Sequence, residues 1–512
     1  MGMENIDHVV VVMMENRSFD SLLGWLYDDK TDPPTHNIPP QSPPTFDGLL
    51  AGTYFNTFEA LPIYASRPPT GWLPFNNPFV VPTPDPREEF DHITTQIFES
   101  AFPALGAAPS MGGFLADYAK DAATPGTAGQ IMQSFGPQEA TVINSLARNF
   151  AVSDRWFASV PAQTWPNRGF IHSGSSDGHI NNDHYELYDI PTIFNVLQDQ
   201  GKSWGVFCDT TLVPSLTRGQ FLPRLYDYPN HFHQYSIFKH LCQADVNAAP
   251  ATKLPSYCFV EPRFVPELGL FRMDYPNDYH PPHDVARGEA FLAEIYQSVR
   301  SSPYRDKILL VITFDEHGGC YDHVPPPTGA AAPAPWPLSR DGRFDFSRFG
   351  VRVPAIVISS YVRPGTVFRA SPGEAPYDHT SILATLRDWL GLASNPAHSF
   401  LPSPRIKNAP TLDRILTWGA TDRLTAWPEI LPGRLAGTDD ESHQTPLNDV
   451  QKSLLATALR MHGDRAVQGM AVPGVAVTGL SVTGIAAPDE ATQAKALQTY
   501  QDAFHFLHPD AP

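Results

Sequence analysis

VVVVMMENRSF, the stretch from Val9 to Phe19, joins six apolar residues to an abruptly polar end. Its length and its β-branched valines predict a fully buried strand, of the kind found most often in parallel sheets. Glu15 and Asn16 follow where that strand would end, and burying them costs free energy unless a charged group meets them. In open α/β sheets, ligands bind beyond the carboxyl ends of the strands. Taken alone, the stretch is equally compatible with a solvated polar loop.

Further apolar runs and helical patterns alternate along the chain. Strands are predicted at residues 204–208, 256–262, 307–316 and 353–360. Helices are predicted at residues 138–150, 192–203, 284–302 and 379–392, and Gly391 is a typical end for the last of them. This alternation predicts βαβ crossovers, and therefore an α/β fold with a mostly parallel central sheet covered by helices on both faces.

The chain divides into a main domain over residues 1–402 and a C-terminal appendage over residues 403–512. Residues 33–86 are rich in proline and show little periodicity, which indicates an ordered insertion or cap within the main domain. In the appendage, two predicted helices, 447–462 and 489–506, flank the stretch AVPGVAVTGLSVTG. No motif there suggests chemistry, so we expect the appendage to supply no catalytic group.

Composition excludes several classes of protein. The 512 residues are 42% hydrophobic and 17% charged, which is typical of a globular chain. A net charge of −19 argues against nucleic acid as a partner and against anionic membranes, although transient contact with neutral lipid remains possible. The four cysteines form no CxxC pair, so reduced, packed thiols are expected. We expect a soluble protein, cytoplasmic or secreted without a visible leader, because neither a signal peptide nor a membrane span is recognisable.

A second stretch, ILLVITFDEHGGCYDH from Ile308 to His323, repeats the pattern of the first. A buried strand again ends in acids, here Asp315 and Glu316. Neighbouring carboxylates repel one another, and a divalent cation is the usual way to hold several together. Two such strand ends therefore predict one shared metal site, whereas a single one would be explained by a helix cap or a salt bridge.

A third stretch, SVPAQTWPNRGFIHSGSS from Ser159 to Ser176, surrounds a hydroxyl with prolines. Pro161 and Pro166 predict a rigid turn around Thr164, with a helix beginning near Asn167. A hydroxyl at such a place can be both a metal ligand and a nucleophile, and the helix N-terminus can receive an anion. On its own the pattern is also typical of an ordinary turn.

Together, ENRSFD, PAQTWPNRGFIHS and ITFDEHGGCYDHVPPP resemble the phosphoesterase family of bacterial phospholipases C, plant non-specific phospholipases C and the related acid phosphatase. The resemblance continues through NDYHPPHDVARGEAFLAEIYQSVRSSP, FGVRVPAIVISSYV and YDHTSILATL, in the same order along most of residues 6–392. It implies an alkaline-phosphatase-like α/β/α sandwich, with the site at the carboxyl edge of the sheet.

The resemblance also implies roles for individual residues. Thr164 falls at the family's nucleophile position, facing a divalent metal whose other ligands would be Glu15, Asn16, Asp315 and Glu316. The remaining residues on family motifs are assigned to catalysis or substrate binding, and they are His283, Asp284, Asp322, His323, His379 and, for a phosphoryl oxygen, Asn167. Where plant members carry DPGH, this chain reads DPREEF, so Glu88 stands in place of a phosphate-facing histidine.

The expected function is that of a metal-dependent phospholipase C, a phosphoric ester hydrolase acting on glycerophospholipids. Thr164 would form a phosphothreonine as diacylglycerol leaves, and His283 or His323 would protonate the leaving oxygen. Two alternatives stay open, namely a broad-specificity phosphomonoesterase of the acid phosphatase type on the same site, and a non-catalytic lipid-binding effector. Oxygen ligands favour Ca²⁺, Mg²⁺ or Mn²⁺, and nearby histidines keep Zn²⁺ possible. Head-group preference and oligomeric state are not fixed by the sequence.

Overall fold

The computed structural model describes most of the chain up to residue 458. The described residues are 2–28, 30–69, 77–122, 124–182, 186–210, 213–268, 273–392, 400–401, 403–419, 421–422, 424–434, 446–455 and 457–458. The second helix expected in the C-terminal appendage, 489–506, lies outside them. Among these residues, no helix combines the length and the apolar character needed to cross a lipid bilayer.

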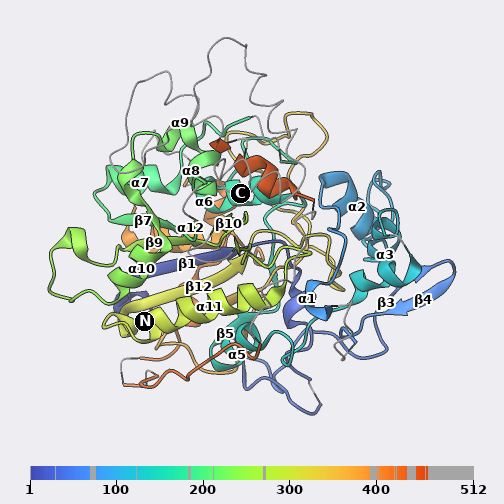
Figure 1. Ribbon diagram of the computed structural model, residues 1–512, viewed down its shortest axis with the longest axis horizontal. Coiled ribbons are helices and arrows are strands. Elements are labelled where there is room, and N and C mark those ends of the chain that lie inside the picture. The colour runs from blue at the N-terminus through green and yellow to red at the C-terminus, as the bar shows by residue number, and fades with distance from the viewer. Residues whose placement is uncertain are drawn as a thin grey trace, which may run out of the picture.

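A nine-stranded sheet forms the centre of the described structure (Figure 1). Its strands follow in the order β2 (His36–Ile38), β14 (Thr366–Phe368), β5 (Ala151–Ser153), β13 (Ala355–Ile358), β12 (Ile308–Phe314), β1 (His8–Met14), β9 (Tyr257–Glu261), β7 (Trp204–Cys208) and β8 (Phe232–Gln234). Neighbouring strands pair in parallel, except that β13 runs antiparallel to both β12 and β5. The predicted α/β fold with a mostly parallel sheet is therefore confirmed.

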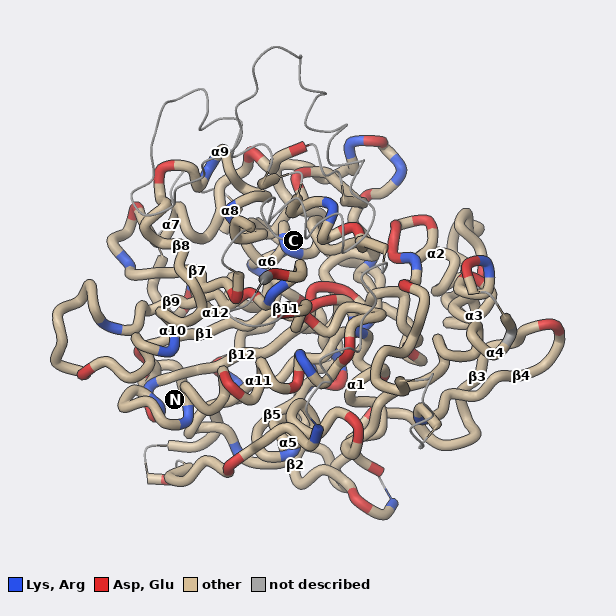
Figure 2. Tube along the Cα trace, viewed as in Figure 1, with Lys and Arg blue, Asp and Glu red and all other residues tan. Residues whose placement is uncertain are grey.

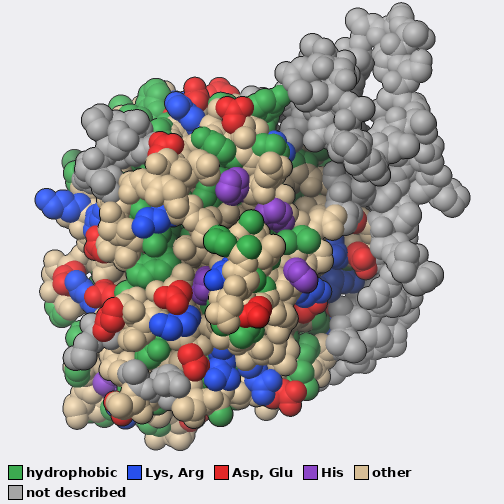
Figure 3. Space-filling model, turned by 90° about the vertical axis from the view of Figure 1, so that its left-hand side faces the viewer, with side chains coloured by type: hydrophobic (Ala, Val, Ile, Leu, Met, Phe, Trp, Pro, Cys, Tyr) green, Lys and Arg blue, Asp and Glu red, His purple; other side chains and the backbone are tan. Residues whose placement is uncertain are grey.

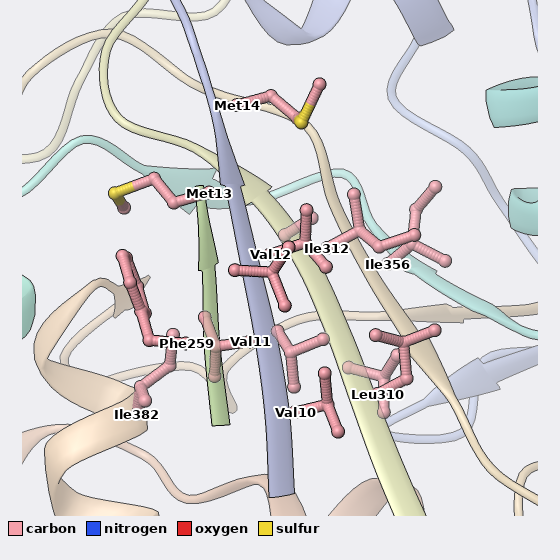
Figure 4. Close-up of a cluster of buried hydrophobic side chains, with 14 of the residues drawn as sticks. Val10, Val11, Val12, Met13, Met14, Phe259, Leu310, Ile312, Ile356 and Ile382 are labelled. Carbon is pink, nitrogen blue, oxygen red and sulfur yellow. The ribbon is translucent and has the colours of Figure 1, made fainter. Parts of the chain in front are cut away.

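The strand at the start of the chain lies in the middle of this sheet. All seven residues of β1 are buried, and its valines pack against side chains of β9, β12 and β13 and against Ile382 (Figure 4). Burial on both faces explains why the strand is a continuous apolar run rather than an alternating one. In its register with β12, His8 lies opposite Ile308 and Met14 lies opposite Phe314. The two strands therefore end together at one edge of the sheet.

Four of the helices lie where the sequence predicts them. They are α5 (Thr141–Asn149), α7 (Ile193–Asp199), α11 (Val285–Arg300) and α12 (Thr380–Leu390). Gly391 ends α12 in the left-handed conformation, with φ of 59°, which glycine adopts without steric cost. One group of packed helices joins α5 and α11 to α1 (Phe19–Leu23) and α10 (Tyr235–Cys242), and another joins α12 to α6 (Thr164–Ser173) and α13 (Pro404–Asn408).

The remaining α-helices and strands of the described structure lie outside the central sheet. They are α2 (Phe90–Phe98), α3 (Phe114–Tyr118), α4 (Pro125–Ala128), α8 (Leu216–Gln220), α9 (Leu222–Leu225), β3 (Phe55–Phe58), β4 (Leu61–Tyr64), β6 (Trp156–Phe157), β10 (Glu267–Leu268), β11 (Met273–Asp274) and β15 (Tyr377–Asp378). The hairpin β3–β4 and the helices α2 and α3 form a lobe beside the sheet (Figure 1). The proline-rich segment 33–86 supplies both this hairpin and the edge strand β2, so its described part is ordered.

Residues beyond 403 contribute to the same core as the sheet. Ile406, Leu412, Ile415 and Leu454 are buried within the main hydrophobic cluster. The predicted boundary at residue 403 stays a prediction, because these contacts join the appendage to the main domain without dividing them. The four cysteines are buried and free, as expected. On the face shown in Figure 3, acidic and basic side chains are intermixed.

Candidate active site

The ends of β1 and β12 bring two acids together, as the sequence predicts. Glu15 and Asp315 directly follow the paired residues Met14 and Phe314, so they leave the sheet side by side. The backbone N–H of Asn16 donates to Asp315 Oδ1 at 3.1 Å, and that of Glu316 donates to the same oxygen at 2.8 Å. Figure 2 shows several acidic positions gathered at the middle of the molecule.

Thr164 lies against this edge, at the first residue of α6. Its hydroxyl donates to Glu15 Oε2 at 3.2 Å and to Asn16 Oδ1 at 3.3 Å. The sequence predicted that this helix begins near Asn167, but it begins at Thr164. Pro166 fits in the first turn, because the N–H that proline lacks would make no hydrogen bond there. The predicted nucleophile is thus both at a helix N-terminus and in contact with the predicted ligands.

Asn167 holds the turn that precedes Thr164. Its Nδ2 donates to the backbone oxygen of Ala162 at 2.7 Å, and its Oδ1 accepts from the N–H of Val160 at 3.2 Å. Both ends of the amide are therefore engaged by the chain itself. These contacts fix the turn, and the expectation that Asn167 binds a phosphoryl oxygen stays a prediction.

Arg168 is a member of the site that the sequence argument missed. Its Nε donates to Glu15 Oε1 at 3.0 Å, and its Nη2 also contacts Glu15 and the backbone oxygen of Met13. The side chain is fully buried, and Nη1 has no hydrogen-bond partner among the described residues. Its position could have been noticed in the PNR motif, because Arg168 directly follows Asn167 and is the only Lys or Arg in that stretch of helix.

Glu88 joins the site from the opposite side of Asn16. Nδ2 of Asn16 lies 2.6 Å from Glu88 Oε2 and 2.7 Å from His280 Nε2. Glu88, His280 and Asp85 offer ligand atoms that all lie within 4.8 Å of one another, which makes them a second group able to hold a cation. The sequence argument also missed His280 and Asp85. In the motif HPPHD it chose the second histidine, His283, and in DPREEF it chose Glu88.

The acids of this edge are unusually costly to ionise. Burial, followed by the charge of Asp315, raises the pKa of Glu15 well above its ordinary value. Burial and the charge of Asp315 act in the same direction on the pKa of Glu316. Burial, followed by the charge of Glu316, likewise raises the pKa of Glu88. Such a concentration of carboxylates calls for positive charge.

The donor atoms fit a divalent cation. Asp315 Oδ2 and Glu316 Oε1 are buried and have no hydrogen-bond partner among the described residues. Buried oxygens without partners cost free energy, and a cation would satisfy them. Carboxylate, amide and hydroxyl oxygens are hard ligands of the kind that Mg²⁺, Mn²⁺ and Ca²⁺ prefer, while His280 is the nearby nitrogen ligand that suits Zn²⁺.

Asp322 and His323 belong to a different cluster. Arg352 Nε donates to Asp322 Oδ1 at 2.9 Å, and Arg352 Nη2 donates to Asp20 Oδ1 at 2.9 Å. His323 Nδ1 lies 2.6 Å from Asp20 Oδ2, and its Nε2 lies 3.2 Å from Asp47 Oδ1. Both nitrogens of His323 are therefore held by carboxylates. Asp322 and His323 thus belong to an ion network that fixes the chain after β12, and their expected catalytic roles stay predictions.

His283 and Asp284 divide between the site and the fold. His283 Nδ1 lies 2.5 Å from Asp278 Oδ1, and the backbone oxygen of Asp278 accepts from the N–H of Glu15 at 2.9 Å. Asp284 is instead the N-cap of α11 and accepts from Arg434 Nη1 at 2.7 Å. Asp284 is thus a helix cap and an ion-pair partner, and its expected place in substrate binding stays a prediction.

His379 supports the end of β12. Its Nε2 lies 2.6 Å from the backbone oxygen of Asp315, and its Nδ1 accepts from Trp156 Nε1 at 3.4 Å. Burial lowers the pKa of His379, so the neutral ring donates to Asp315. His379 thus helps to position a predicted metal ligand, and its expected role in substrate binding stays a prediction.

Comparisons with known proteins agree with these motifs. The phosphoesterase family model matches residues 6–393. Non-specific phospholipases C3 and C6 of Arabidopsis thaliana are 33% and 34% identical, over 90% of this chain and 83% and 81% of their own lengths. Phospholipase C B of Mycobacterium tuberculosis is 25% identical over 76% of this chain and 74% of its own. A solved structure in the alkaline phosphatase superfamily from Vibrio parahaemolyticus covers 55% of this chain and 66% of its own, with 11% identity and a TM-score of 0.31, too slight a likeness to support an argument.

Proposed function

Since the chain belongs to the phosphoesterase family and is a phosphoric ester hydrolase, we propose that it acts as a phospholipase C on glycerophospholipids, with Thr164 as the nucleophile. The observation that carries this proposal is the place of the Thr164 hydroxyl, at the N-terminus of α6 and within 3.3 Å of both Glu15 and Asn16. The names of the relatives support phospholipase C activity over other phosphoester hydrolysis.

In the first step, Thr164 Oγ1 forms a bond to phosphorus and passes its proton towards Glu15. The bond between phosphorus and the glycerol oxygen breaks, and diacylglycerol leaves with a proton on that oxygen. In the second step, water attacks the phosphothreonine, so that the head group leaves with its phosphate and the hydroxyl is restored. The N–H groups at the start of α6 favour the anionic phosphoryl group throughout.

His283 is the proton donor that we propose for the leaving oxygen. Asp278 holds its Nδ1, which fixes the orientation of the ring, and Nε2 would be the nitrogen that exchanges a proton. The same Asp278 also accepts from the backbone of Glu15, so the ring is tied to the edge that carries Thr164. His323 is the weaker candidate, because both of its nitrogens face carboxylates.

Glu15, Asn16, Asp315, Glu316 and Thr164 would hold a divalent cation. When bound, it would supply positive charge that eases ionisation of a hydroxyl and stabilises negative charge on phosphoryl oxygens. Arg168 orients Glu15 and its charge favours the ionised carboxylate, and its Nη1, which has no hydrogen-bond partner among the described residues, would donate to a phosphoryl oxygen.

The test is turnover of phosphatidylcholine beside a small phosphomonoester, for the parent protein and three variants. Thr164→Ala should lower turnover by about 10³-fold or more, since removing a covalent nucleophile typically costs this much. Thr164→Ser should keep appreciable activity, because a primary hydroxyl can occupy the same place. Ser173→Ala, at the other end of α6, is the matched control and should leave turnover unchanged.

Mass spectrometry after an acid quench with substrate should find the added phosphate on the peptide that contains Thr164. Phosphate on Ser173, Ser175 or Ser176, or an active Thr164→Ala variant, would show that the nucleophile is another residue. Turnover of the phosphomonoester alone, with phosphatidylcholine left intact, would show that the protein is a phosphomonoesterase.

A further inference from the structure

A cavity of about 600 Å³ lies apart from the candidate active site. Its described lining comes from Phe349 and from three segments that are distant in sequence, 327–331, 373–378 and 405–414. None of the predicted metal ligands, nor Thr164, is among the described residues that line it. Its volume falls in the range of about 300–1,000 Å³ that is typical of sites for small organic ligands.

Positive charge exceeds negative charge in this cavity. Arg405, Lys407 and Arg414 line it together with two acids, Glu374 and Asp378. Glu374 is paired with Arg414 at 2.6 Å. Lys407 is exposed and makes no ion pair with any described residue. Arg405 is paired with Asp378 at 3.3 Å, so the excess positive charge of the lining is that of Lys407, which favours an anion in a chain whose net charge is −19.

Arg405 gives the cavity a buried donor that the described chain does not satisfy. The residue is 3% exposed, and its Nε is buried without a hydrogen-bond partner among the described residues. Its guanidinium lies over the rings of Phe349, at 4.2 Å, and Phe170, at 5.2 Å. The N–H groups of a guanidinium lie in its plane, so an additional acceptor must approach in that plane. An unsatisfied buried donor costs free energy, and a ligand oxygen would remove that cost.

We propose that this cavity is a second ligand site, which binds a small phosphomonoester. A guanidinium and an ammonium group together are the side chains that proteins use to hold phosphoryl oxygens. The volume leaves room for an organic group beside the phosphate. The same phosphate chemistry is offered by a soluble ester and by the head group of phosphatidic acid, so both sources are tested below.

Arg405 connects the cavity to the turn that leads to Thr164. Arg405 Nη2 contacts the backbone oxygen of Ser159, which begins the turn that leads to Thr164, and lies 3.3 Å from Asp378 Oδ2. Ser159 Oγ donates to the same Asp378 oxygen at 2.8 Å. A ligand that draws Arg405 towards the cavity would therefore act on this turn. This connection rests on the proposed function, whereas binding of the ligand does not.

The binding test is calorimetric titration of the full chain with glycerol 3-phosphate. The parent should show two classes of site, one at the candidate active site and one in the cavity. Lys407→Gln should weaken one class by about 10-fold or more, since it removes one charge-assisted contact from an exposed position that folding does not need. Lys30→Gln removes the same charge from an exposed loop that does not line the cavity, and it should match the parent.

Sedimentation with phosphatidylcholine vesicles, with and without phosphatidic acid, distinguishes the two sources. Loss of glycerol 3-phosphate binding in Lys407→Gln supports a soluble ligand. Binding to phosphatidic acid vesicles that depends on Lys407, without binding of glycerol 3-phosphate, supports a lipid head group. If Lys407→Gln matches the parent in both assays, the cavity is not a phosphate site. Because these readouts measure binding, they stand even if phospholipase activity is absent.

Discussion

The ion network around His323 predicts how the stability of the protein depends on pH. The ring is nearly buried, with its side chain 6% exposed, and it lies between Asp20 and Asp47. Burial alone would lower the pKa of His323, but the carboxylates of Asp20 and Asp47 outweigh it and raise the pKa to about 9. The folded protein therefore holds this proton far more tightly than the unfolded chain, in which the ring keeps its ordinary pKa of 6.5.

The size of the effect follows from the two pKa values. Each pKa unit corresponds to about 1.4 kcal/mol, so protonated His323 adds about 3 kcal/mol to the free energy of unfolding. A histidine whose pKa is raised by folding stabilises the folded state fully when the pH is below its pKa in the unfolded chain. This stabilisation is lost as the pH rises through its pKa in the folded protein. The contribution should therefore be complete below pH 6.5 and gone above about pH 9. Asp322, with its pKa raised by burial to about 6, titrates below this window.

The measurement is urea unfolding followed by tryptophan fluorescence at several pH values between 6 and 9.5. Across this range the free energy of unfolding of the parent should fall by about 3 kcal/mol more than that of His323→Gln, because the variant has no ring to titrate. His8→Gln is the control, since burial lowers the pKa of His8 and places its titration below the window. Parallel pH profiles for the parent and His323→Gln would refute the assignment of a charged ring to this network.

Three further variants test the edge of the sheet. Glu15→Ala should lose the divalent cation and activity together, as measured by elemental analysis and turnover, and full metal occupancy would contradict its role as a ligand. Asn167→Ala should lower kcat with little change in KM and lower the free energy of unfolding by about 1–3 kcal/mol, because buried backbone groups lose their partners. Gly318→Ala should lower stability more than Gly373→Ala. Both glycines have positive φ, but only at Gly318 would a Cβ lie 2.2 Å from the backbone oxygen of Asn16, so equal urea midpoints would show that the turn can yield.

The strands were predictable because burial on both faces leaves a direct signature in composition. Runs such as 8–14 and 307–316 contain β-branched and apolar residues at nearly every position, and β1 and β12 lie where these runs are. The antiparallel direction of β13 was not predictable, since the run at 353–360 has the same apolar composition as the parallel strands. Apolar composition reports burial, whereas direction is decided by how the connecting chain returns to the sheet.

The site was predictable where a residue's chemistry is visible beside a strand, and less so where its role depends on a distant partner. Glu15 and Asp315 could be placed together because parallel strands end at the same edge. Arg168 and His280 were missed because nothing near them in sequence shows that they face Glu15 and Asn16. For the same reason, Asn167 was predicted to bind the substrate, and the contacts of its amide within its own turn were not foreseen.

The stretch DEHGGCYDH shows what separates a cation site from an ion network. It carries acids at both ends, Asp315 and Asp322, and local sequence gives no reason to treat them differently. Asp322 pairs with Arg352, which also pairs with Asp20, so positive charge from the chain itself balances that cluster. At the sheet edge the buried Arg168 hydrogen-bonds to Glu15 and lies 3.8 Å from Asp315 Oδ2, and this oxygen is left without a hydrogen bond among the described residues. A cation would satisfy such a buried carboxylate oxygen, which is why we place the proposed metal at the sheet edge rather than at Asp322.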